Sequence, residues 1–125
     1  MNDAVADARQ IKLALDRARS RILGYTGLDA GDDLIGAVLA ACADAAFGVA
    51  PHSELEEAQR GIAARCRRLV DVTNRFVVRD FELIALSRRR AIAAVDVFQD
   101  VITGGHKGGV APQLSAAGLL RERAR

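Results

Sequence analysis

The sequence lacks tryptophan and has only one tyrosine, four phenylalanines and two prolines among its 125 residues. With so few aromatic side chains, the core of this chain must be built from alanine, leucine, isoleucine and valine, which favours closely packed helices. Pro51 is the only proline before residue 112, so little interrupts a helix over most of the chain. The sequence therefore predicts a single all-α domain.

Long apolar runs and an excess of one charge are also missing. The uncharged runs over 34–43 and 108–120 are shorter than the ~20 residues that span a bilayer, and the polar N-terminus does not have the pattern of a cleavable secretory signal. We therefore expect no membrane insertion and a protein that is cytoplasmic or exported without a cleavable signal peptide. The net charge is only +2, because 16 acidic residues are interleaved with 18 basic ones. This balance argues against strong non-specific DNA binding.

Residues that carry chemistry are scarce. The two histidines, His52 and His106, are far apart and lie beside proline or glycine, and no Glu-x-x-His, GxGxxG or Walker pattern occurs. Cys42 and Cys66 lack CxxC spacing and have no histidine nearby in the sequence to activate them. We expect two buried core cysteines, with an interhelical disulfide as the alternative. The sequence thus predicts a protein that is not an enzyme and binds neither metal nor cofactor.

Two helices are expected in the first half of the chain. Apolar residues recur every three or four positions over 3–23, which predicts an amphipathic helix that ends at Gly24. A second helix is expected over 33–47, where apolar residues cover most of the helix circumference, and Gly48 and Pro51 follow it. A helix that is apolar on several sides should be buried on several sides.

A third and much longer helix is expected to follow. Ser53 and Glu56 have the spacing of a capping box, which predicts a helix start at residue 54. We expect this helix to continue over 54–103, about 75 Å at 1.5 Å per residue, with a break near residues 73–74 as the alternative.

The overall prediction is an all-α domain over 1–103, in which two shorter helices pack on one long helix. Four glycines and a proline lie between residues 104 and 112, so residues 104–125 are expected to form a Gly-rich linker and a flexible tail.

Apolar residues on the long helix recur every seven positions in two adjacent rows, the pattern of a coiled-coil seam. We predict that this helix-seam core contains Leu55, Ile62, Leu69, Val77, Leu83, Ile84 and Phe98. Phe76 and Phe81 are expected in the same core. Because two short helices cannot cover the whole seam, we expect a homo-oligomer, most simply an antiparallel dimer, or a helical protein partner.

Arginines are grouped on the same helix, and one set falls near a single face at spacings of three, seven and four: Arg65, Arg68, Arg75 and Arg79. Such a face can bind an anion or an acidic partner, or it can be a solvated face paired with neighbouring acids. No aromatic residue interleaves with these arginines as in base-stacking surfaces. The leading hypothesis is a non-enzymatic helical protein–protein interaction module, and a small nucleic-acid-associated regulator is the alternative.

The stretch Phe76-Val77-Val78-Arg79-Asp80 places an aromatic residue four positions before an acid. Together with the residues around it, over 53–90, this stretch resembles the second helix of the small Ala-rich helical hairpins associated with type VII (ESX) secretion. Phenylalanine stands where that family has tyrosine, and the family's Trp-x-Gly turn is absent. The resemblance implies a secretion-associated substrate or adaptor, with Phe76 and Asp80 as its partner-binding or export signal.

Overall fold

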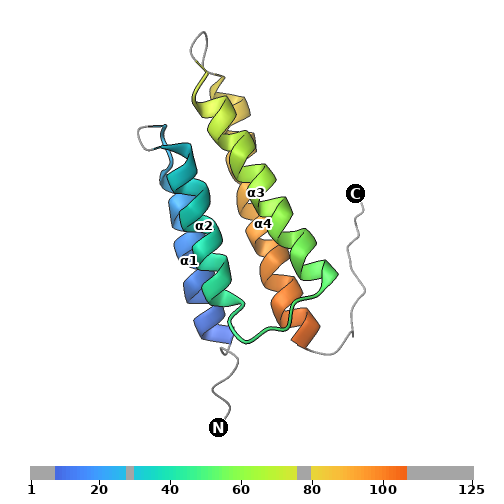
Figure 1. The fold of residues 1–125 in the computed structure, drawn as a ribbon. Coiled ribbons are helices and arrows are strands. Elements are labelled where there is room, and N and C mark those ends of the chain that lie inside the picture. Colours follow the sequence, from blue (N-terminus) through green and yellow to red (C-terminus); the bar gives the residue numbers. More distant parts are fainter. Residues whose placement is uncertain (1–7, 28–29, 76–79, 107–125) are drawn as a thin grey trace.

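The computed structural model describes residues 8–27, 30–75 and 80–106. These residues form four helices and no strand: α1 (Ala8–Gly24), α2 (Gly31–Ala45), α3 (Ser53–Thr73) and α4 (Phe81–His106). Figure 1 shows the helices running alternately up and down. The prediction of an all-α fold is confirmed.

The four helices form two antiparallel hairpins. α1 packs along α2, and α3 packs along α4. The hairpins join through contacts of α1 with α4 and of α2 with α3, so that each helix has two neighbours (Figure 1). This arrangement is an up-down-up-down four-helix bundle. Gly31 marks a close approach of α2 to α3, because a Cβ atom at this position would lie 2.5 Å from Cγ1 of Val70.

The prediction of a single helix over 54–103 is wrong, and the alternative of a break near residues 73–74 is confirmed. α3 ends at Thr73, where the backbone N–H of Asn74 donates to the Val70 carbonyl at 3.0 Å. The Asn74 side chain then donates through Nδ2 to the Tyr25 hydroxyl at 3.0 Å. Asparagine is a weak helix former that favours helix ends, and here its side-chain bond ties the end of α3 to the α1–α2 hairpin.

Side chains just outside α3 and α4 fix where these helices begin. Oδ1 of Asp80 accepts from the Leu83 backbone N–H at 2.9 Å, the bond of an N-cap residue. At the start of α3, Nδ1 of His52 accepts from the Leu55 N–H at 3.3 Å. The N-cap of α3 is therefore His52, and the predicted capping box, with Ser53 as its cap, is wrong: the histidine acceptor begins the helix one residue earlier.

The other helix boundaries shift by a few residues. α2 begins at Gly31 and ends at Ala45, about two residues earlier at each end than expected. α4 extends through His106, so the helix takes in residues 104–106, which were assigned to the linker. The rest of the expected linker and tail, over 107–125, lies outside the described residues.

The core lies between the four helices and contains most of the predicted seam. Leu55, Ile62, Leu69, Ile84 and Phe98 are buried, Leu83 is half-buried, and Val77 and Phe76 lie outside the described residues. The other large buried side chains come mainly from the first two helices and include Leu15, Ile22, Leu34 and Val38. Because α1 and α2 cover the seam within one chain, it does not need a second chain to bury it. Phe81, expected in the core, is 72% exposed, since it begins α4 instead of lying inside a longer helix.

Polar side chains join the first helix to the last. Arg19 on α1 donates to the Asp96 carboxylate on α4 at 2.8 Å and to Asp16 on its own helix at 2.9 Å. Near the C-terminal end of α1, Nη1 of Arg88 on α4 donates to the carbonyls of Ile22, Leu23 and Tyr25, at 2.6, 3.2 and 3.0 Å. Arg88 thus donates to carbonyls at and just after the end of α1 and complements the dipole of this helix.

Replacing Arg88 by alanine should lower the free energy of unfolding by about 2 kcal/mol, because the half-buried carbonyls would lose a charged donor. Urea unfolding followed by circular dichroism measures the change. The matched control is Arg89→Ala, which removes an exposed arginine from the same helix and should change stability by less than about 0.5 kcal/mol. Equal losses in the two variants would show that the capping contact does not stabilise the bundle.

Candidate docking groove

The described residues show no arrangement typical of a metal site or a membrane span. No group of three or more histidine, cysteine or acidic side chains is placed to hold a metal ion in this part of the chain. None of the described helices combines the length and the apolar character needed to cross a bilayer.

The two cysteines lie in the core, on α2 and α3, and both are free thiols. Loss of hydration on burial raises the pKa of Cys42 to about 12 and that of Cys66 to about 11. A cysteine reacts as its thiolate, which is scarce at neutral pH when the pKa is so high. Cys42 and Cys66 are therefore core residues, as predicted, and are poorly suited to act as nucleophiles.

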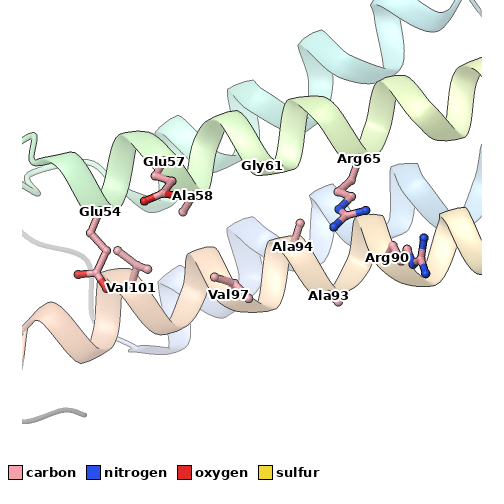
Figure 2. Close-up of a pocket in the computed structure, with 10 residues that line it drawn as sticks. All are labelled: Glu54, Glu57, Ala58, Gly61, Arg65, Arg90, Ala93, Ala94, Val97 and Val101. Atoms are coloured by element: carbon pink, nitrogen blue, oxygen red, sulfur yellow. The ribbon is translucent and has the colours of Figure 1, made fainter. Parts of the chain in front are cut away.

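A surface groove lies between α3 and α4, with a volume of about 490 Å³. Figure 2 shows the side chains that line it from both helices. Its floor is made of small and apolar residues: Ala58 and Gly61 from α3, and Ala93, Ala94, Val97 and Val101 from α4. Val97 is 55% exposed there. A Cβ atom placed on Gly61 would meet no atom within 4 Å, so the groove is open above this glycine.

Charged side chains of opposite sign mark the two ends of the groove. Glu54 and Glu57 lie at one end, and Arg65 and Arg90 lie at the other (Figure 2). A second hollow shares Gly61, Arg65 and Arg90 with the first and adds Arg68, Ser87 and Leu83, so that the groove continues toward the start of α4.

The three arginines of the groove, Arg65, Arg68 and Arg90, take part in none of the ion pairs that join described residues. All three side chains are exposed, so their guanidinium groups can reach a binding partner. Arg19, by contrast, is already paired within the bundle with Asp16 and Asp96.

Only some of the predicted site residues line the groove. Arg65 and Arg68 line the groove, whereas Arg75 is exposed beyond the end of α3 and Arg79 lies outside the described residues. Of the proposed export pair, Asp80 is the N-cap of α4 and Phe76 lies outside the described residues.

Sequence reasoning missed Arg90, which joins the groove only because α4 folds back along α3. It also missed the role of Glu54 and Glu57 as the acidic end. Glu54 and Glu57 lie seven and four residues before Gly61, a spacing that places all three on one face of α3 and could have indicated this role.

A scan against protein-family models finds no match, and comparisons with curated proteins and with solved structures find none either. The class of protein is therefore defined by its fold and surface: a four-helix bundle with an open groove that is basic at one end and acidic at the other.

Proposed function

We propose that this protein is a non-enzymatic helical protein–protein interaction module and that the α3–α4 groove is its docking surface. The observation that carries the proposal is the combination of a partly exposed apolar floor with exposed arginines at its rim, which form no ion pair with another described residue. Burial of the floor supplies affinity, and the charges select and orient the partner.

The dimensions of the groove suit a helix. Glu54 and Arg68 are separated by 14 residues on α3, roughly 21 Å at 1.5 Å per residue, which is the length of about four helical turns. Small residues such as Ala58 and Ala94 let a third helix approach at the usual interaxial distance of about 8–10 Å. An amphipathic helix in a groove is a common mode of peptide recognition.

The distribution of charge favours a protein partner over a nucleic acid. A phosphate backbone lying along the groove would meet Arg65 and Arg90 at one end but would be repelled by Glu54 and Glu57 at the other. Duplex binding that weakens steeply between about 50 and 200 mM salt would support the nucleic-acid alternative instead.

An association with type VII secretion stays a prediction from the sequence resemblance. Asp80, one of the two residues that carry it, has a local structural contact as the cap of α4.

Site-specific photo-crosslinking in the native host tests the docking surface. With p-benzoylphenylalanine at position Val97, we expect a discrete covalent adduct, because the floor of the groove would be covered by the partner. The same probe at Leu13, an equally exposed position on α1, is the control and should give no such adduct.

A second substitution, Gly61→Leu, should abolish the Val97 adduct by filling the groove. Leucine is a better helix former than glycine by almost 1 kcal/mol, and open space lies above Gly61, so this variant should fold at least as well as the original. If the adduct is absent from the unmodified groove, or persists unchanged in Gly61→Leu, the groove is not the docking surface.

A further inference from the structure

The charged residues of the groove are arranged antisymmetrically along α3. Glu57 lies four residues before Gly61, and Arg65 lies four residues after it. Glu54 lies seven residues before Gly61, and Arg68 lies seven residues after it. Spacings of four and seven residues keep all five positions on one face of a helix, and all five line the groove. If α3 is turned end to end about Gly61, each of these two glutamates takes the position of one of the two arginines.

Such a face is complementary to itself. A two-fold axis passing through Gly61, perpendicular to α3, places a second α3 antiparallel to the first. Glu57 of each copy then faces Arg65 of the other, and Glu54 of each copy faces Arg68 of the other. Two copies thus form four pairs of opposite charge, and no pair of like charge among these positions.

The residues at the axis allow the close approach that this arrangement needs. Gly61 has no side chain, and neighbouring Ala58 and Ala64 also line the groove. Small residues at a crossing point bring two helix axes close together. On α4, the exposed Val97 provides apolar surface for the second copy to bury.

We propose that the occupant of the groove is a second copy of this chain, with the two α3 helices antiparallel and crossing at Gly61. This inference rests on the proposed function of the groove as a docking surface. Exposed ion pairs contribute little affinity individually, so the four pairs set the register and direction of the dimer while the apolar floor holds it together.

Charge reversal followed by sedimentation equilibrium tests the proposal. The original chain should show a concentration-dependent monomer–dimer equilibrium. Arg65→Glu should weaken the dimer more than about tenfold, because Glu57 of each copy would then face a glutamate. The control is Arg67→Glu, which reverses an exposed charge on the same helix outside the groove and should leave the dimer intact.

Restoring the complementarity should restore the dimer. A chain carrying both Arg65→Glu and Glu57→Arg should dimerise like the original. Residues 57 and 65 are about 12 Å apart along α3, too far to pair within one chain, so recovery can only come from pairing between copies. Mixing the Arg65→Glu chain with the Glu57→Arg chain should likewise yield a heterodimer that is tighter than the homodimer of either chain.

The outcomes separate the identity of the occupant from the function of the groove. A chain that stays monomeric, with a Val97 adduct containing a different protein, would overturn the second-copy proposal and leave the docking function standing. A dimer unaffected by Arg65→Glu would place the interface elsewhere and overturn the proposal as well. An adduct with twice the mass of the chain, together with recovery in the double variant, is the expected result.

Discussion

Replacing Phe98 by alanine should lower the free energy of unfolding by about 4 kcal/mol. Phe98 is fully buried, with 0% of its surface exposed, and it is the largest such side chain in the core. Removing its ring would take away apolar contacts on several sides and leave a cavity that α1 and α3 cannot fill without moving. Chemical denaturation with a fitted slope for each variant measures the loss.

The control is Phe81→Ala, which removes the same side chain from the start of the same helix. Phe81 is 72% exposed, so this change should cost less than about 0.5 kcal/mol. From the sequence, both phenylalanines are expected in the core of one long helix, which implies similar costs at the two positions. Similar measured costs would therefore contradict the observed break between α3 and α4.

Stability should also fall steeply above pH 9. The thiols of Cys42 and Cys66 have their pKa raised by burial from 9.0 to about 12 and about 11, so the folded chain keeps these protons while the unfolded chain releases them. The stabilisation is complete below pH 9 and is lost as pH rises toward the folded pKa values. Between pH 9 and 11, each thiol should reduce the free energy of unfolding by about 1.4 kcal/mol per pH unit.

Urea unfolding at half-unit pH steps from 8 to 11 measures this dependence. A chain with both Cys42→Ala and Cys66→Ala is the control: it should be less stable at pH 8, because buried volume is lost, but it should show a shallower decline above pH 9. Parallel declines in the two proteins would mean that the cysteines do not cause the alkaline loss.

Local sequence signals were sufficient for the first two helices and for most of the core. The three-to-four spacing located α1 and α2, and the seven-residue rows identified Leu55, Ile62 and Leu69 as buried. The rows could not locate the end of α3, because residues facing the core of an antiparallel hairpin repeat in the same way as those on one continuous helix. The break depended on the bond from the Asn74 side chain to the Tyr25 hydroxyl and on the capping bond of Asp80, which become evident only in the folded structure.

Only the α3 side of the groove could be predicted from the sequence. Arg65 and Arg68 lie on one helix, and their spacing alone places them on a common face. Arg90 and Val97 reach the same surface only after α4 folds back along α3. No spacing rule within a single helix relates residues 65 and 90, since their proximity is a property of the tertiary fold.

The polar bridge between α1 and α4 bears on the order in which the chain folds. Each hairpin is closed by contacts between consecutive helices, whereas Arg19 and Asp96 are 77 residues apart in the sequence. Closing a longer loop costs more chain entropy, so the two hairpins should form first and dock afterwards. Substitutions at Arg19 or Arg88 should accordingly speed unfolding while leaving the folding rate almost unchanged. The contacts between the first and last helices thus control the unfolding rate, and with it the lifetime of the folded bundle.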